Sequence, residues 1–332
     1  MIDYDFYKHR TYLIIIIICV CFLFIIINLF SIQIINNSYK ISAQNNVVRK
    51  IIKSAERGWI YDRNNQLIVS NQKSHDIMIV PYQLHKAIDT VLISKIFGIS
   101  VDDVAKKLEN ARKYSNYKPS IFIKDIEKIN FIKVQENLHL LKGFYPQEKY
   151  IREYSTNSGG NIFGYIGQIT NKLLKANPAY SKGDLIGISG VEKIYEEFLK
   201  GTKGVERKVV DVFGKYQGQF KEGGYDTLPK AGHDITITID IKLQEYAEKI
   251  MSNKRGSIVA IEPETGEILC LVSSPNFNPS VFLGQKRSEN FRKLYLDPGK
   301  PLYDRSISAN YPPGSIFKLI NALIGLQENL IN

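Results

Sequence analysis

Cysteine is scarce in this sequence: Cys19, Cys21 and Cys270 are the only three among 332 residues. The first two lie in an N-terminal apolar stretch and the third in an expected strand, so no disulfide framework is predicted. The five histidines are scattered, without the paired spacing of a metal site, and no Cys-x-x-Cys occurs. We therefore predict neither a bound metal nor any other cofactor.

Phosphate-binding patterns are missing as well. The glycine-rich run at residues 159–167 contains no Gly-x-Gly-x-x-Gly, and the sequence has no Walker pattern of Gly-Lys followed by Ser or Thr. A tight turn against a strand is therefore favoured over a nucleotide site.

A long apolar run is the first feature that is present. Residues Tyr12–Ile35 are almost wholly Ile, Leu, Val, Phe and Cys, and about twenty apolar residues span a bilayer. Because Lys8 and Arg10 precede the run, we predict a cytoplasmic tail at 1–10, a single transmembrane helix at 11–35 and an exported remainder. A cleaved signal peptide is the alternative, but the run is long for one and the only small-residue cleavage candidate lies far beyond it.

Lysine and arginine outnumber aspartate and glutamate by 44 to 33, a formal net charge of +11. This excess suggests affinity for anionic lipid or wall polymer. Nucleic acid is not an expected partner behind a membrane anchor. The hydrophobic fraction of 44% is ordinary for a folded protein, and the chain outside the membrane is long enough for two domains.

The first domain is predicted at residues 55–234, after a polar and basic linker at 36–54. A charged cluster at 57–63 stands beside an Asn-Asn turn between expected strands, which predicts a structural salt-bridge corner. A helical stretch over 93–141, broken near Pro119, predicts a small helical subdomain. A later amphipathic helix is predicted to share one apolar face among Val191, Ile194, Tyr195, Phe198 and Leu199.

The second domain is predicted at residues 235–332 and opens with an alternating strand and a helix whose Leu243, Ala247 and Ile250 share a face. Two apolar strands, at 258–261 and 268–272, are joined through a Gly-containing turn and predict an antiparallel hairpin. Because neither strand alternates strongly, both faces are expected to be covered, one of them by the helix after Ser315.

Ser315 and Lys318 form a Ser-x-x-Lys motif at the start of that last helix. Residues three apart share a helix face, so the amine can take the hydroxyl proton when the serine attacks a carbonyl. The helix is apolar nearly all round, which predicts burial, and burial would lower the pKa of Lys318 and leave a usable base. The alternative is a surface lysine with a packed stem. Similar strings at Ser70 and Ser115 lack a following helix.

Six spaced motifs give residues 57–318 a resemblance to the class B penicillin-binding proteins, of the penicillin-binding protein 2 type. The motifs are Arg57-Gly-Trp-Ile-Tyr-Asp-Arg63, Gly187-Ile-Ser-Gly-Val-Glu192 with Gly201-x-x-Gly204, Ile237-Thr-Ile-Asp240 with Gln244, Thr265-Gly-Glu-Ile-Leu269, Ser274-Pro-Asn-Phe-Asn-Pro279 and Tyr311-Pro-Pro-Gly-Ser-Ile-Phe-Lys318. The Pro301-Leu302 and Arg305 stretch favours the elongation type over the division type. The fold implied is a membrane-anchored α+β protein, with a pedestal or dimerisation domain and the beginning of a serine β-lactamase-like transpeptidase domain.

This resemblance also implies a function, that of a peptidoglycan D,D-transpeptidase of cell-wall elongation. Ser315 would be the acyl nucleophile and Lys318 the general base. The implied ligands are peptidoglycan stem peptides and β-lactam antibiotics. The implied protein partner is a membrane glycosyltransferase of the elongation machinery. The implied location is the inner membrane, with the bulk of the chain in the periplasm.

Two elements of the family's active site are not found after the serine. The sequence has no Lys-Thr-Gly, and its Ser-x-Asn strings, which begin at residues 155, 274, 288 and 308, all precede Ser315. We therefore expect a truncated transpeptidase domain with little activity alone. The alternatives are a non-catalytic membrane scaffold that contacts the glycosyltransferase, and a membrane-bound β-lactam sensor.

Overall fold

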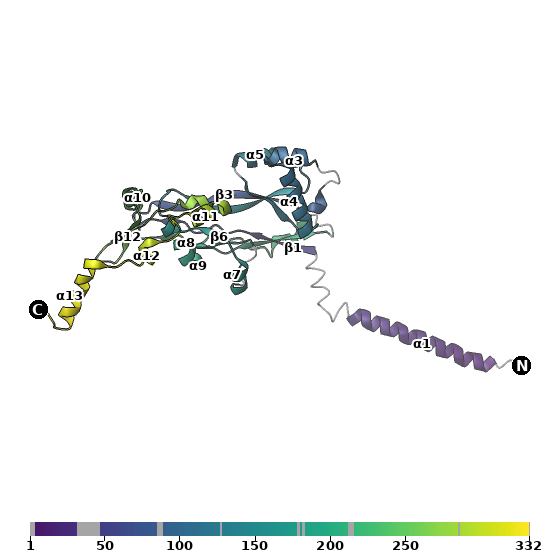
Figure 1. The fold of residues 1–332 in the computed structure, drawn as a ribbon. Coiled ribbons are helices and arrows are strands. Elements are labelled where there is room, and N and C mark those ends of the chain that lie inside the picture. Colours follow the sequence, from purple (N-terminus) through teal and green to yellow (C-terminus); the bar gives the residue numbers. More distant parts are fainter. Residues whose placement is uncertain are drawn as a thin grey trace. The chain divides into compact units, whose positions relative to one another are not determined.

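The computed structural model describes residues 4–31, 47–84, 89–126, 128–177, 180, 183–211, 216–284 and 286–331. The chain separates into two compact units, and each is described by itself (Figure 1). The first unit comprises Met1–Lys53, Asn116–Lys118 and Gly204–Leu228. The second comprises Ser54–Ser115, Pro119–Lys203 and Pro229–Asn332.

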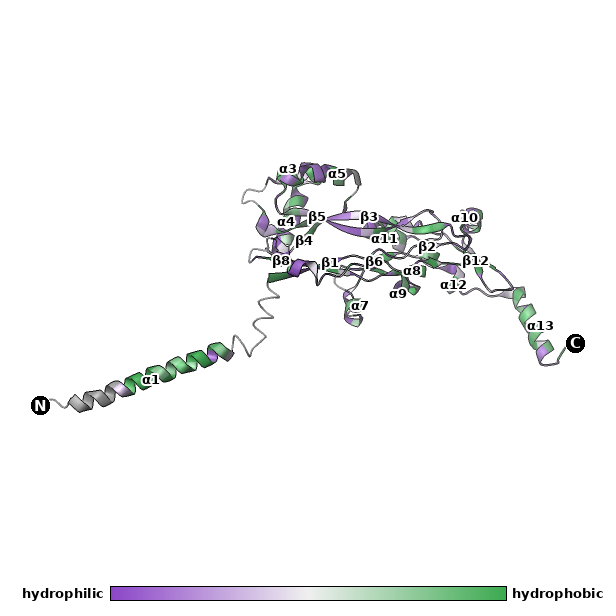
Figure 2. Ribbon diagram, turned by 180° about the vertical axis from the view of Figure 1, so that it is seen from behind, coloured by the Kyte–Doolittle hydropathy of each residue, from purple (hydrophilic) through white to green (hydrophobic). Residues whose placement is uncertain are grey.

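The first unit begins with helix α1, Tyr4–Phe30. Its stretch Tyr12–Phe30 is long and apolar enough to cross a membrane (Figure 2), and none of it is buried within the protein. The helix predicted at 11–35 is present, but it starts earlier, inside the predicted tail, because no Pro or Gly stands before the apolar run. The predicted end of the helix and most of the linker lie outside the described residues.

A three-stranded antiparallel sheet forms the rest of the first unit, in the order β1-β8-β9. Its elements are β1 Val48–Lys53, β8 Gly204–Val210, β9 Tyr216–Gln219 and the short 3-10 helix η4 Phe220–Gly223. Lys53 and Glu206 form an ion pair of 3.4 Å across β1 and β8. The last part of the predicted linker is therefore wrong, because residues 48–53 pair with a strand that is distant in sequence.

A five-stranded sheet organises the second unit, in the order β10-β2-β3-β4, with β5 also paired to β3. Its strands are β2 Ile60–Tyr61, β3 Leu67–Ile79, β4 Ser120–Ile126, β5 Phe144–Tyr154 and β10 Ile235–Thr236. Pairing with β5 runs from Val69 to Ile79, so β3 is one long strand. The apolar runs at residues 67–69 and 77–80 predict two separate strands, but the polar residues between them also pair with β5.

The predicted helical subdomain is present next to β4. Its helices are η2 Pro81–Gln83, α3 Thr90–Phe97, α4 Val101–Tyr114, α5 Lys128–Asn137 and η3 Leu138–Leu140. Three aromatic rings, from Phe97, Phe122 and Phe144, lie 5.0–5.7 Å apart in its core. The strand β4 within this region was not predicted.

Short elements follow β5: α6 Gly160–Phe163, β6 Ile166–Gln168, α7 Asn171–Ala176, β7 Leu185–Gly187, α8 Gly190–Ile194 and α9 Glu196–Leu199. The glycine-rich run is a tight turn that leads into β6, as predicted. Gly159 and Gly164 adopt φ angles of +75° and +72°, and a Cβ at Gly160 would lie 2.1 Å from the carbonyl oxygen of Phe277. Glycine is therefore required for this close approach.

The predicted face of the helix at 191–199 is confirmed at Leu199, which is buried, and at Val191, which packs against the same core, but it is wrong at Ile194 and Phe198, which are 75% and 57% exposed. The helix is divided between α8 and α9, and its buried side also carries Glu192 and Glu196. The two carboxylates bond to buried guanidinium groups from other segments. A buried charge requires a partner, and this requirement outweighs the apolar periodicity of one short helix.

The remaining elements are α10 Ile241–Ile250, β11 Gly256–Ile261, β12 Ile268–Ser274, η5 Pro279–Phe282, α11 Arg287–Leu296, α12 Arg305–Ser308, η6 Gly314–Ile316 and α13 Phe317–Gln327. Strands β11 and β12 form the predicted antiparallel hairpin. One face of it packs on α10 through Ala247, Cys270 and Val272. Of the helix face predicted on α10, only Ala247 is buried.

Candidate functional site

Ser315 lies in the 3-10 helix η6 and Lys318 in the first turn of α13, which continues directly from it. Gly314, just before the serine, has a φ of +54°, a conformation that glycine adopts without strain. The two residues of the motif thus stand within one helical turn, in the arrangement that the motif predicts. Both are exposed.

The predicted burial of this helix is wrong. Ile316 is 76% exposed and Leu319 is 71% exposed, and Gly325 is the only buried residue of α13. Among the described residues the helix contacts mainly its own C-terminal return, where the amide of Leu330 donates to Gly325. An apolar circumference favours burial only where another surface is available to cover it. The low-dielectric surroundings predicted for Lys318 are therefore absent here.

The hairpin is affected in the same way. The helix after Ser315 does not cover it, and the residues of β11 alternate between half-buried and exposed, with Val259 and Ile261 on the exposed side. The prediction that both faces are covered is thus wrong for the described chain.

Arg305 fixes the segment that leads to the serine. It is buried, and its guanidinium donates to the carbonyl oxygens of Gly299, Lys300 and Tyr303. The backbone amide of Arg305 donates to the hydroxyl of Ser273 at the end of β12. The sequence marked Arg305 only through the family resemblance, because a turn closed by one arginine leaves no periodic signal.

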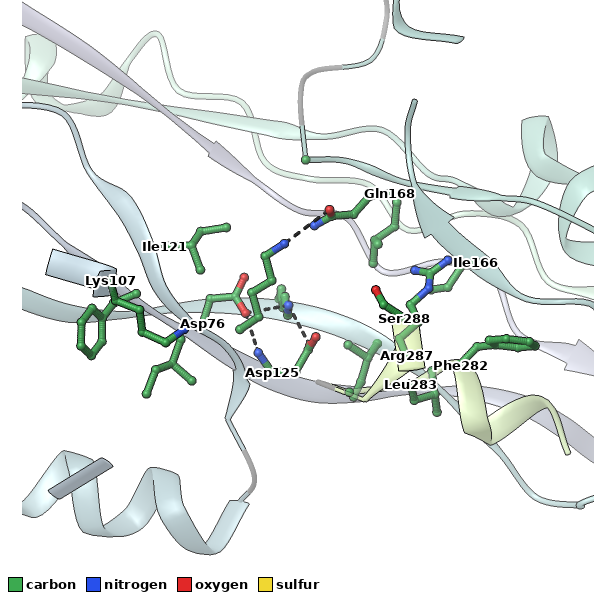
Figure 3. A pocket seen from close by; sticks show the side chains of 18 of the residues that line it. Asp76, Lys107, Ile121, Asp125, Ile166, Gln168, Phe282, Leu283, Arg287 and Ser288 are labelled. Atoms are coloured by element: carbon green, nitrogen blue, oxygen red, sulfur yellow. Dashed lines mark hydrogen bonds and ion pairs between the residues drawn. The ribbon is translucent and has the colours of Figure 1, made fainter. Parts of the chain in front are cut away.

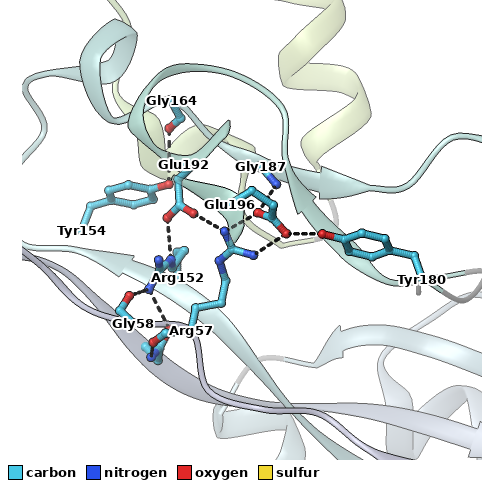
Figure 4. A network of polar contacts seen from close by, with 10 residues as sticks. Arg57, Gly58, Arg152, Tyr154, Gly164, Tyr180, Gly187, Glu192 and Glu196 are labelled. Carbon is cyan, nitrogen blue, oxygen red and sulfur yellow. Dashed lines mark hydrogen bonds and ion pairs between the residues drawn. The ribbon is translucent and has the colours of Figure 1, made fainter. Parts of the chain in front are cut away.

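A second polar constellation is fully buried, and it joins several of the family motifs (Figure 4). The Arg57 guanidinium lies 2.7 Å from Glu192 and 2.6 Å from Glu196. Arg152 on β5 bonds Glu192 at 2.6 Å and also donates to the carbonyl of Gly58. We call Arg57, Arg152, Glu192 and Glu196 the Arg–Glu cluster. Its two positive and two negative charges balance, as buried charges require.

Several neutral groups complete the Arg–Glu cluster. The hydroxyl of Tyr180 and the amide of Gly187 donate to Glu196, at 2.9 Å each, while the side-chain oxygen of Asn71 accepts from Arg152. Of the four charged residues in the cluster, the sequence motifs contain only Arg57 and Glu192. The sequence does hold one indication that a second arginine is needed. Glu192 and Glu196 are spaced i and i+4 on one predicted helix, and if both are buried they require more than one cationic partner.

The pKa values of Arg57, a member of the cluster, and of Tyr154, which lies close to it, are both shifted. Burial acts to lower the pKa of Arg57, but the charges of Glu192 and Glu196 outweigh it, and the pKa is raised. Burial, with a contribution from Glu192, raises the pKa of the Tyr154 phenol. These shifts keep the arginine charged and the phenol neutral at neutral pH, which is typical of a structural cluster.

The predicted salt-bridge corner at 57–63 is confirmed. Asp62 is buried, and its carboxylate accepts from the backbone amides of Asn64 and Gln66. Arg63 forms an ion pair of 3.3 Å with Glu267, a residue of the second predicted domain. Among the described residues no group of three or more His, Cys, Asp or Glu side chains is placed to hold a metal ion.

These features define the class. It is an α+β protein with one apolar N-terminal helix, a domain held together by the buried Arg–Glu cluster, and a β-hairpin followed by a Ser-x-x-Lys turn. Residues 52–237 match the Penicillin-binding Protein dimerisation domain, and residues 256–332 match the Penicillin binding protein transpeptidase domain. The chain therefore belongs to the penicillin-binding proteins, and the resemblance seen in the sequence is confirmed.

Curated relatives are named as peptidoglycan D,D-transpeptidases. The chain is 32% identical over 284 residues to the peptidoglycan D,D-transpeptidase MrdA of Acinetobacter baumannii, an alignment that covers 83% of the chain and 41% of the relative. It is 30% identical over 320 residues to MrdA of Escherichia coli K12, covering 92% and 49% respectively. The chain thus spans about half the length of the curated relatives it matches.

A solved structure supports the fold. The complex between Penicillin-Binding Protein (PBP2) and MreC from Helicobacter pylori matches with a TM-score of 0.71 and 24% identity, over 86% of the chain and 54% of the solved chain. The predicted α+β fold class, with a dimerisation and a transpeptidase domain, is thereby confirmed.

Proposed function

We propose that this chain takes part in peptidoglycan D,D-transpeptidation, with Ser315 as the acyl nucleophile and Lys318 as its proton acceptor. The observation that carries the proposal is the Ser315–Lys318 turn, which lies within the stretch that matches the transpeptidase domain. Relatives that align across this stretch are named peptidoglycan D,D-transpeptidase.

The reaction would proceed in two steps. The Ser315 oxygen attacks the carbonyl between two terminal D-alanines, its proton passes to the Lys318 amine, and the last D-alanine leaves with a proton. An amine of a neighbouring stem peptide then attacks the acyl ester and regenerates the serine. β-Lactams would acylate the same oxygen by ring opening.

A further element is needed for this chemistry. An oxyanion hole contributes about 3–4 kcal/mol of transition-state stabilisation. In the family that the sequence resembles, a Lys-Thr-Gly strand supplies part of it, and this sequence contains no Lys-Thr-Gly.

The apolar helix supports a single-pass anchor, with the N-terminus cytoplasmic and the bulk of the chain periplasmic at the inner membrane. A membrane glycosyltransferase is the proposed partner in that setting, and MreC is a second one, since the matched H. pylori protein was solved in complex with it. The exposed apolar residues Ile194 and Phe198 on α8 and α9 favour a docking role for the pedestal. This role is the second candidate function, and it does not depend on acylation.

Labelling with a fluorescent penicillin tests the first proposal. Membranes that contain the full chain would be compared with the variants Ser315→Ala and Lys318→Ala, both of which should lose all labelling. Ser257→Ala and Lys242→Ala change exposed residues of the same domain and serve as matched controls. Absence of labelling in the folded wild-type chain would reject autonomous acylation and favour the docking role.

The docking role has its own test. Ile194→Glu should reduce recovery of the glycosyltransferase with the full chain, whereas Val259→Glu, on the exposed side of the hairpin, should not. Equal recovery with both variants would contradict a docking surface on α8 and α9.

A further inference from the structure

A cavity of about 690 Å³ opens in the second unit (Figure 3), and Ser315 is not among the residues that line it. The lining comes from strands β3, β4, β5, β6 and β7 and from helices α4, η5 and α11. A volume of this size is typical of sites for small molecules, which occupy roughly 300–1,000 Å³. Nothing in the proposed transpeptidation uses it.

The carboxylates of the cavity are already neutralised. Lys149 reaches Asp76 at 2.6 Å and Asp125 at 2.7 Å, and Asp76 also accepts from the backbone amide of Asp125. All three side chains are largely buried. This end of the cavity is therefore a closed ion-pair group with little capacity for a cation.

Three other basic residues line the cavity: Lys107, Lys124 and Arg287. Within the described part of the chain, no carboxylate lies within ion-pair distance of any of them. Lys124 donates to the side-chain oxygen of Gln168, at 3.4 Å. With four basic and two acidic side chains in its lining, the cavity carries an excess of positive charge.

Arg287 is the most constrained of these cations. It is half-buried at the first residue of α11, and its guanidinium lies 5.9 Å from the ring centre of Tyr165. Gly167 on β6 makes room for it, since a Cβ at that position would lie 2.4 Å from the Arg287 Nη2 atom. Figure 3 shows Arg287 and Ser288 extending from α11 toward the β6 residues Ile166 and Gln168.

The placement of Arg287 has an electrostatic cost. Burial lowers the pKa of the Arg287 guanidinium, and Tyr165 and Asp125 offset this only in part. A cation–π contact compensates modestly for lost hydration and leaves the in-plane N–H donors free. A guanidinium with free donors and no carboxylate partner is well suited to bind an oxyanion through two parallel hydrogen bonds.

We infer that this cavity is a binding site for a small molecule that carries an oxyanionic group, either carboxylate or phosphate. Arg287 receives the oxyanion, and Lys124, held by Gln168, adds a second positive charge. The apolar side chains of Phe282 and Ile121 contact the rest of the ligand. The site is separate from Ser315, so its test does not depend on the proposed transpeptidation.

Isothermal titration calorimetry of the full chain in detergent tests the site, with glutarate and inorganic phosphate as separate probes in a buffer free of other oxyanions. Saturable binding of glutarate identifies carboxylate as the preferred group, and saturable binding of phosphate identifies phosphate. Arg287→Gln should weaken the binding at least tenfold. Lys124→Gln should weaken it about threefold, since an exposed lysine contributes less than a partly buried arginine.

Lys293→Gln is the matched control, because this residue lies on the same helix, is 70% exposed and pairs with Glu289 outside the cavity. It should leave the binding unchanged. If Arg287→Gln does not fold, Gly167→Ala provides the same comparison by displacing the guanidinium. The inference is overturned if neither probe saturates, or if binding is unchanged in the Arg287 and Lys124 variants alike.

Discussion

The Arg–Glu cluster and the Ser315–Lys318 turn both consist of charged or polar family motifs, but their surroundings are opposite. The cluster is assembled from separate parts of the second unit, and its side chains are 10% exposed or less. The turn is formed by one contiguous segment and is exposed. Two residues close in sequence are brought together by the chain itself. A charged residue contributes strongly to the stability of the fold only where other segments bury it.

Glu192→Gln should give the largest effect on this comparison. It removes one charge from the cluster and leaves Arg57 and Arg152 with a single carboxylate, so the free energy of unfolding should fall by about 3–5 kcal/mol. Denaturant unfolding of the full chain in detergent measures it. Glu197→Gln, at a carboxylate that is 80% exposed and pairs with Lys200, should change it by less than about 0.5 kcal/mol. Similar decreases in the free energy of unfolding of both variants would show that the buried cluster stabilises the fold no more than an exposed ion pair does.

Truncation of leucines compares the apolar parts of the two regions. Leu199 is fully buried next to the cluster, and Leu199→Ala should destabilise the chain by about 2–5 kcal/mol through the cavity it leaves. Leu323 on α13 is 66% exposed, and Leu323→Ala should cost less than about 0.5 kcal/mol. The same unfolding measurement applies. A large loss from Leu323→Ala would mean that α13 is covered in solution.

Alkaline pH should weaken the cluster through Tyr154. Its pKa is raised in the folded chain, so the stabilisation is complete below the unfolded-state value of about 10 and is lost as the pH rises above it. The decrease approaches about 1.4 kcal/mol per pH unit. Unfolding midpoints between pH 9 and 11 should fall less steeply in Tyr154→Phe than in the wild type, while Tyr246→Phe, at an exposed position, keeps the wild-type slope.

Substitution of the turn itself should give the smallest effect on stability. Ser315→Ala and Lys318→Ala remove exposed side chains with no bonded partner among the described residues, so each should change the free energy of unfolding by less than about 0.5 kcal/mol. Thermal unfolding of the labelling variants checks this directly. A strong destabilisation by either substitution would show that the turn is packed, and would also invalidate any loss of labelling as evidence of chemistry.

The elements that were predicted well depend on local signals. The apolar run of α1, the hairpin of β11 and β12, the glycine turn before β6 and the corner at Asp62 each follow from neighbouring residues. Three of the errors share one cause, which is a partner distant in sequence. The face of α8 and α9, the extent of β3 and the strand β1 are each decided by such a partner.

By itself, the sequence determined the apolar helix, the order of the family motifs and the proximity of Ser315 to Lys318, because each is a property of one short segment or of composition. Only the tertiary structure decided that Arg152 completes the Arg–Glu cluster, that Arg287 faces a cavity and that α13 is exposed. These outcomes depend on which surfaces pack against one another. Burial determines the free-energy cost of a charged side chain and the stabilisation from an apolar one, and burial is set by tertiary packing.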